Sequence, residues 1–208
     1  MAAIYVNGVK TSCMAIGGGG SSPLQFKTWA HLDGVHAFAL DINIQASYDH
    51  KITFEWYDAV EDDDGYRFSI YNGSWFYCRR RYRQYYMPGP GNGGSQFWAG
   101  NIGETHLMIN NDEEHKNYID GNYIGDVTNF SQSGTATYNQ YWIGGQYSAG
   151  SSHAYIKQFK IESISTGDTI CNLVPCLFDN TVHCLYDTIN KRFYYCDGLQ
   201  VMDTIPTT

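Results

Sequence analysis

The stretch Lys51-Ile-Thr-Phe-Glu-Trp56 decides the fold class of this 208-residue chain, because apolar and polar side chains alternate along it without a break. Successive side chains of a β-strand point to opposite faces of its sheet, so a strand with one buried face carries this period of two. The pattern places Ile52, Phe54 and Trp56 together on one face. We therefore expect a strand from a sheet that is buried on one side.

Short segments on both sides of this stretch carry the same signals of strands separated by tight turns. The turn pair Asn72-Gly73 lies between Arg67–Tyr71 and Ser74–Cys78, and a second hairpin is expected to turn at Asp120-Gly121. Further strands are expected at Thr105–Ile109, Asn117–Ile119, Asn122–Ile124, Tyr138–Ile143 and Ile156–Ile161. No window combines helix caps with a sustained apolar helical period. Many short strands at this spacing predict an all-β protein built as a two-sheet sandwich or a barrel.

The composition agrees with a β-rich protein and excludes several classes of function. The chain has 18 Tyr, 10 Phe and 5 Trp beside 22 Gly, a mixture that favours strands and turns over helices. Its 13 basic and 21 acidic residues give a net charge of −8. Nucleic acid is therefore not expected as a partner, because phosphate binding needs positive potential. No stretch approaches the about 18 apolar residues that cross a membrane, so a membrane is not expected either.

Residues 1–22 are expected to form an arm separate from a domain of residues 23–208. The turn pair Asn7-Gly8 predicts a small hairpin within residues 4–12, and Gly17–Ser22 has the composition of a flexible linker. The arm is either a frayed terminus or an anchor onto a partner, and as an anchor it would allow homo-oligomers to form. We favour the anchor slightly, because a short hairpin needs a surface to pack on.

The start of the chain lacks a basic segment followed by a long apolar run, so no secretory signal is expected. The six cysteines are accordingly expected to be reduced thiols. One exception stays open. If the chain turns near Asn190-Lys191 between two strands, Cys184 and Cys196 would lie roughly opposite each other and could form a disulfide.

An ordered series of motifs in the C-terminal third resembles a known family. The motifs are Ile156–Glu162, Asn172-Leu-Val-Pro-Cys176, Cys184-Leu-Tyr-Asp187, Asn190–Tyr194 and Asp197-Gly198, with Tyr118-Ile-Asp-Gly121 upstream. The series is similar to the concanavalin A-like, laminin-G-like jelly-roll domains of bacteriophage structural proteins and gut bacterial surface proteins. Cys184 stands where that family usually has glycine. The resemblance covers roughly residues 25–200. It implies a two-sheet antiparallel jelly-roll sandwich and leaves the ligand open, since this fold has many functions.

Enzymatic activity is not expected. Jelly-roll glycoside hydrolases of the laminarinase type carry two or three carboxylates closely spaced on one strand, and no such string occurs here. The nearest pair, Glu55 and Asp58, would lie on opposite faces of a strand. Asp112–Glu114 is expected in a solvated polar turn. No Gly-x-Ser-x-Gly elbow is present, and His106 is expected to be a hydrogen-bonded surface residue of a strand.

One acidic segment, Glu61–Gly65, is a candidate calcium site. Asp62, Asp63 and Asp64 supply clustered carboxylate oxygens, the ligands that calcium prefers. The spacing is not that of an EF-hand loop, and the alternative interpretation is a solvated acidic tip. No other cofactor is expected.

The segment Trp75–Tyr86 is the strongest candidate for a binding surface. If it stays extended, six side chains rich in aromatic rings and guanidinium groups share one face: Trp75, Tyr77, Arg79, Arg81, Arg83 and Tyr85. Such a face suits sugar stacking and bidentate hydrogen bonding, and its local positive charge also suits an acidic glycan. It equally suits a protein interface, where Tyr, Trp and Arg are enriched. A third interpretation is a structural sheet face whose arginines pair with the acidic loops of the chain.

The sequence indicates two candidate functions. The first is a non-enzymatic, lectin-like module on a phage virion that binds host or mucosal glycans and is anchored by its N-terminal arm. The second is a virion structural or decoration protein whose jelly roll serves assembly with other virion proteins. A secreted bacterial adhesin is disfavoured because no secretory signal is recognised.

Overall fold

A computed structural model describes residues 3–6, 9–12, 24–33, 40–59, 66–71, 75–81, 84–88, 95–99, 101–127, 140–146, 149–151, 153–195 and 198–206. These residues form 21 β-strands and no helix. Every strand pair in this part of the chain is antiparallel. Nowhere in the described ranges does a helix occur that could cross a membrane. The expected all-β antiparallel class is therefore confirmed.

An 11-stranded sheet is the largest unit of the fold. Its central order is β13 (Asn122–Asp126), β12 (Lys116–Ile119), β11 (Thr105–Asn110), β6 (His50–Asp58), β17 (His153–Ser163), β18 (Thr169–Phe178), β19 (Val182–Asp187) and β20 (Arg192–Tyr194). Three short strands join it at the side: β3 (Leu24–Phe26) pairs with β18, β4 (Trp29–Asp33) pairs with β17, and β21 (Gln200–Met202) pairs with β4.

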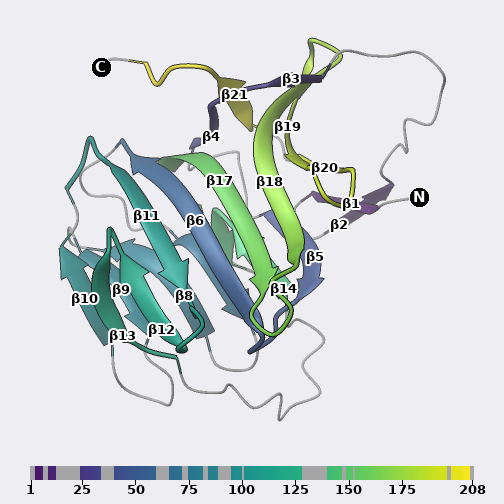
Figure 1. The fold of residues 1–208 in the computed structure, drawn as a ribbon. Coiled ribbons are helices and arrows are strands. Elements are labelled where there is room, and N and C mark those ends of the chain that lie inside the picture. The colour runs from purple at the N-terminus through teal and green to yellow at the C-terminus, as the bar shows by residue number, and fades with distance from the viewer. Residues whose placement is uncertain are drawn as a thin grey trace.

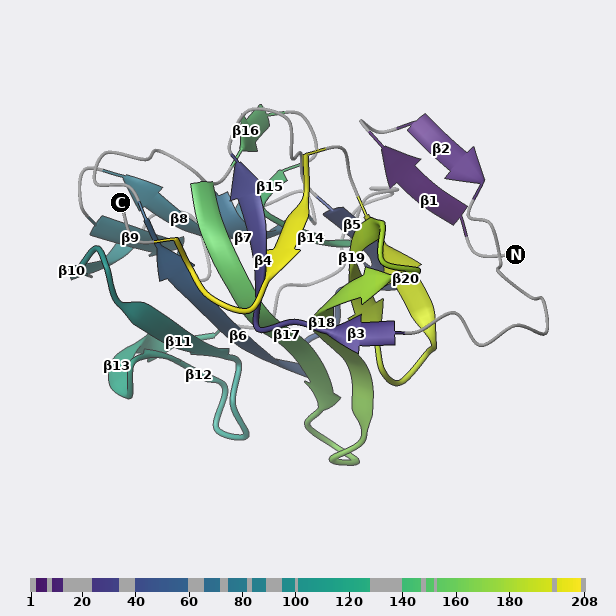
Figure 2. The same ribbon diagram turned by 90° about the horizontal axis from the view of Figure 1, so that it is seen from above.

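A six-stranded sheet lies behind the large sheet in Figure 1. Its order is β10 (Ser95–Ala99), β9 (Gln84–Pro88), β8 (Trp75–Arg81), β7 (Tyr66–Tyr71), β14 (Gln140–Ile143) and β5 (Leu40–Gln45). Two further hairpins are β1 (Ala3–Val6) with β2 (Val9–Ser12), and β15 (Gly145–Gln146) with β16 (Ala149–Ser151). Figure 2 shows the β1–β2 hairpin at the side of the molecule, outside both sheets.

One apolar core joins the two sheets. Phe54 of β6 and Phe159 of β17 are fully buried in it together with Tyr141 and Ile143 of β14 and Ile42 of β5. The rings of Tyr141 and Phe159 lie 6.3 Å apart between centroids. Strands of both sheets therefore bury their apolar faces against each other.

The strand predicted from Lys51–Trp56 is present as β6, with the predicted alternation of buried and partly exposed side chains. Along β6, Ile52, Phe54 and Trp56 are buried while the residues between them are partly exposed. The hairpin predicted at Asn72-Gly73 is confirmed by the register of β7 with β8, which pairs Tyr71 with Trp75. The N-terminal hairpin is confirmed by the pairing of β1 with β2. Residues 13–23 lie outside the described part, so the function of the arm stays a prediction.

Candidate functional site

The predicted Tyr, Trp and Arg face is divided between two strands. β8 ends at Arg81 and β9 begins at Gln84, and the two strands pair so that Arg81 lies opposite Gln84 and Arg80 opposite Tyr85. The condition for one shared face, a single extended strand from Trp75 to Tyr85, is therefore not met, because β8 and β9 are separate strands that pair antiparallel. Arg83 and the side chains of Trp75, Tyr77, Arg79, Arg81 and Tyr85 lie outside the described part, so their binding role stays a prediction.

The expected calcium segment also lies outside the described residues, since Asp62, Asp63 and Asp64 belong to the range 60–65. Within the described ranges, no group of three or more His, Cys, Asp or Glu side chains could hold a metal ion. Calcium at residues 62–64 stays a prediction.

The suggested bridge from Cys184 to Cys196 is wrong, because Cys184 carries a free thiol. Its partner across the β18–β19 ladder is Cys176, and Cys184 Sγ donates a hydrogen bond to the carbonyl of Cys176 at 3.1 Å. Burial raises the pKa of the Cys184 thiol far above its ordinary value. Cys196 is outside the described residues.

His106 is buried, contrary to the expected surface position. Its Nδ1 lies 2.9 Å from a carboxylate oxygen of Asp120 and its Nε2 lies 2.8 Å from the carbonyl oxygen of Asn101. Asp120 also accepts a hydrogen bond from the backbone N–H of Leu107. His106 therefore fastens the β12–β13 turn to β11, which gives it a structural role.

A pocket lies where strands β17 and β18 separate. The two strands pair up to Phe159 and Leu173. Beyond that point β17 pairs with β4, and β18 pairs with β3. Two irregularities accompany this change of partners. β17 has a bulge between Ile156 and Gln158, and β18 has a proline at residue 175, which has no N–H to donate.

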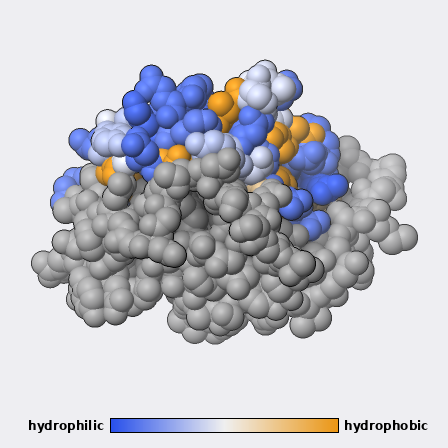
Figure 3. Space-filling model, turned by 90° about the horizontal axis from the view of Figure 1, so that it is seen from below, coloured by the Kyte–Doolittle hydropathy of each residue, from blue (hydrophilic) through white to orange (hydrophobic). Residues whose placement is uncertain are grey.

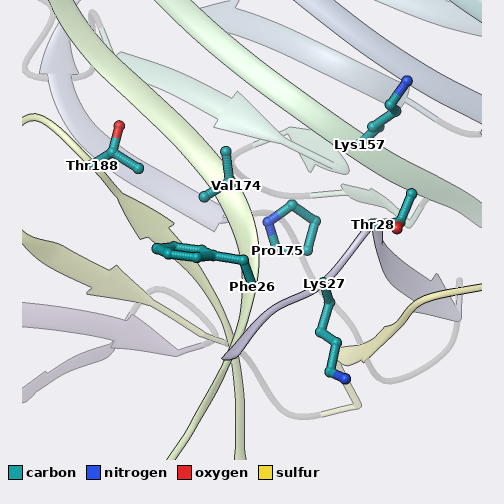
Figure 4. Close-up of a pocket in the computed structure, with 7 residues that line it drawn as sticks. All are labelled: Phe26, Lys27, Thr28, Lys157, Val174, Pro175 and Thr188. Carbon is teal, nitrogen blue, oxygen red and sulfur yellow. The ribbon is translucent and has the colours of Figure 1, made fainter. Parts of the chain in front are cut away.

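Residues 27 and 28 cross the gap between the separated strands. The backbone N–H of Lys27 donates to the carbonyl of Pro175 at 2.9 Å, and that of Thr28 donates to the carbonyl of Met202 at 3.1 Å. The resulting open pocket has a volume of about 460 Å³ and is here called the fork pocket. Figure 4 shows its lining: Phe26, Lys27, Thr28, Lys157, Val174, Pro175 and Thr188.

The lining combines an apolar surface with polar groups in fixed positions. Phe26 is 58% exposed, so one aromatic face is accessible at the edge of the pocket beside Val174 and Pro175. Lys27 pairs with Asp203 at 2.9 Å, and Lys157 pairs with Glu55 at 2.6 Å. Each ammonium group is therefore accompanied by a carboxylate, and the pocket carries little net charge.

A network of hydrogen bonds holds Thr188 at the pocket wall. Asn172 Nδ2 donates to the Thr188 hydroxyl oxygen at 3.0 Å, and Gln158 Nε2 donates to Asn172 Oδ1 at 2.8 Å. The buried carboxylate of Asp187 accepts hydrogen bonds from the backbone and side chain of Asn190, which fixes the turn after Thr188. Asp187 and Asn190, which belong to the C-terminal motifs, thus stabilise the turn that follows Thr188.

Figure 3 shows the lower side of the molecule, where the described surface is mostly hydrophilic and hydrophobic residues lie in small spots. The fork pocket is therefore the candidate site. Sequence reasoning missed it because its residues are far apart in the chain. The signal that could have found it is the proline in the motif Asn172–Cys176, since a proline interrupts the pairing edge of a strand.

Comparison of the chain with protein-family models and with curated proteins found no match.

Proposed function

We propose that the chain is a non-enzymatic glycan-binding module and that the fork pocket is its binding site. The observation that carries this proposal is an open pocket of about 460 Å³ in which the exposed ring of Phe26 lies beside hydroxyl and paired ammonium groups.

Sugars combine the two surfaces that this lining complements. Their C–H faces pack on aromatic rings, and their hydroxyl groups both donate and accept hydrogen bonds. The Thr28 hydroxyl can do the same, and Lys157 with Glu55 places a donor beside an acceptor. None of the described lining residues is a carboxylate, and glycoside hydrolysis needs two. The lining therefore favours binding over hydrolysis.

We propose a two-sheet jelly-roll sandwich of the concanavalin A-like type, supported by two antiparallel sheets that share one core. The location on a bacteriophage virion, after synthesis in the host cytoplasm, rests on the resemblance of the motifs in residues 156–198.

A second candidate function, virion assembly, is favoured by an apolar surface on β3, β18, β19 and β20. Phe26 is 58% exposed, and Leu24 and Val182 are each 39% exposed. Phe26 also contacts Tyr186, whose ring packs against Phe193. If this surface serves assembly, the purified protein should run as an oligomer by size-exclusion chromatography with light scattering. A monomer supports glycan binding.

The proposed function is tested by a glycan array followed by isothermal titration calorimetry with Phe26→Ala. Loss of one aromatic contact of about 1.5 kcal/mol should weaken binding about tenfold. The matched control is Tyr123→Ala, which removes an equally accessible ring, 54% exposed, from β13 at the other end of the large sheet.

The expected result is a sugar ligand whose affinity falls in Phe26→Ala and is unchanged in Tyr123→Ala. Two outcomes overturn the proposal: no sugar binds at millimolar concentration, or Phe26→Ala binds as tightly as the unaltered chain.

A further inference from the structure

Four aromatic side chains form a row on the outer face of the large sheet: Trp29, His31, Tyr57 and Tyr155, here called the aromatic row. The strand register places Tyr155 of β17 between Tyr57 of β6 and His31 of β4. The rings of His31 and Tyr155 stack at 4.4 Å, and those of Tyr57 and Tyr155 meet edge to face at 6.0 Å. Trp29 contacts Tyr57 at 6.2 Å.

This row lies on the face opposite the core. Ala30 and Leu32 alternate with Trp29 and His31 along β4, and both aliphatic side chains are fully buried. Trp29 and Tyr57 are only partly buried, so an aromatic surface is accessible next to the fork pocket.

Lys157 connects the row to the pocket. Its side chain lines the fork pocket, and its Nζ lies 5.9 Å from the centre of the Trp29 ring. Phe26 and Trp29 are separated only by residues 27 and 28, so their Cα atoms lie at most about 11 Å apart. Two aromatic side chains this close can both be contacted by one short chain of linked sugar rings.

The charges along this surface are already balanced. Lys157 is paired with Glu55, and Lys27 is paired with Asp203. An anionic ligand would have to compete with these carboxylates on a chain of net charge −8, whereas a neutral ligand can use donor and acceptor together.

We infer that the fork pocket and the aromatic row together bind a neutral, linear oligosaccharide. This inference rests on the proposed glycan-binding function and adds its substrate class. One ring of the ligand packs on Phe26, a second packs on Trp29, and the Lys157–Glu55 pair hydrogen-bonds the hydroxyl groups between them.

The test is isothermal titration calorimetry with neutral hexose oligomers of one to six units, beside uronic-acid oligomers of the same lengths at the same ionic strength. Affinity for the neutral series should rise about tenfold between the monosaccharide and the longer oligomers, since a second aromatic contact is gained. Trp29→Ala should remove this gain and leave monosaccharide binding unchanged, whereas Phe26→Ala should weaken the whole series.

The variant Glu55→Gln tests the preference for a neutral ligand without removing an aromatic side chain of the protein. Glu55 lies on the outer face, and glutamine keeps its shape while leaving the Lys157 charge unpaired. Uronic-acid oligomers should then bind at least threefold more tightly than they bind the unaltered chain. Circular dichroism confirms that each variant is folded.

The outcomes separate this inference from the proposed function. Equal affinity for monosaccharides and oligomers, or tighter binding of uronic acids by the unaltered chain, overturns the inference while the glycan-binding function stands. If no sugar binds, both fail.

Discussion

A methyl group at residue 144 tests whether the two sheets are in contact where β14 ends. Gly144 has a φ of +78°, and a Cβ built on it would lie 2.1 Å from Cδ1 of Leu32. Leu32 belongs to β4 of the large sheet and is fully buried. Gly144→Ala therefore forces two sheets apart at one point.

The cost of this substitution has two parts. A left-handed backbone costs a non-glycine residue about 1–2 kcal/mol, and overpacking in a core costs about 1–3 kcal/mol. Together they predict a loss of about 2–5 kcal/mol, which lowers the melting temperature of a chain of this size by about 4–20 °C. Gly121→Ala is the matched control, because Gly121 has a φ of +75° and nothing lies within 4 Å of its added Cβ.

Thermal and urea unfolding followed by circular dichroism measures both variants. The double variant Leu32→Ala/Gly144→Ala should cost less than the sum of the two single changes, because the smaller side chain makes room for the methyl group. The contact between the sheets would be refuted if Gly144→Ala and Gly121→Ala lowered the free energy of unfolding equally and if the two changes in the double variant were additive.

Three further predictions concern individual side chains. Hydrogen bonds from the Ser163 hydroxyl and the backbone N–H of Ser165 lower the pKa of Asp49 below its ordinary 3.8, so the ionised carboxylate stabilises the fold above pH 3.8 and this stabilisation is lost as the pH falls. In Asp49→Asn, the urea midpoint of unfolding should therefore fall less steeply between pH 6 and pH 2 than in the unaltered chain. An unchanged pH dependence contradicts this. Asp120→Ala should cost about 2 kcal/mol or more in urea unfolding, because it leaves the buried His106 ring without its carboxylate partner, and a loss below about 0.5 kcal/mol would count against that pairing. Burial raises the pKa of the Cys184 thiol, so iodoacetamide at pH 8 should label it only in denaturant, and rapid labelling of the folded chain would show that the thiol is accessible.

The sequence predicts those parts of the fold in which local pattern and tertiary burial agree. β6 was predictable because its inner face packs on the core along its whole length, which forces a period of two. The hairpins at Asn72-Gly73 and Asp120-Gly121 were predictable because those residues tolerate the positive φ of tight turns, observed at +51° for Asp120 and +75° for Gly121.

The reversal between β8 and β9 could not be predicted in the same way. The two residues between these strands are Tyr82 and Arg83, and neither belongs to the usual turn formers. The alternation of the segment Trp75–Tyr86 is equally compatible with one long strand, so only the register of β8 with β9 separates the two arrangements.

The fork pocket was unpredictable for a different reason. Phe26, Lys157 and Thr188 come from distant parts of the chain and meet only because β17 and β18 exchange partners beyond Phe159 and Leu173. Sequence patterns report which face of a strand is buried, and they do not report which strands pair. His106 was misplaced on the surface because its partner Asp120 lies in the β12–β13 turn, 14 residues further along the chain.

Chemical-shift mapping by NMR during titration with a neutral hexose oligomer tests whether glycans bind at the fork pocket. We expect the largest shifts on Phe26, Thr28, Lys157 and Thr188, with smaller shifts on Trp29. Shifts confined to Trp75–Arg81 and Gln84–Pro88, or no shifts at millimolar sugar, would contradict it.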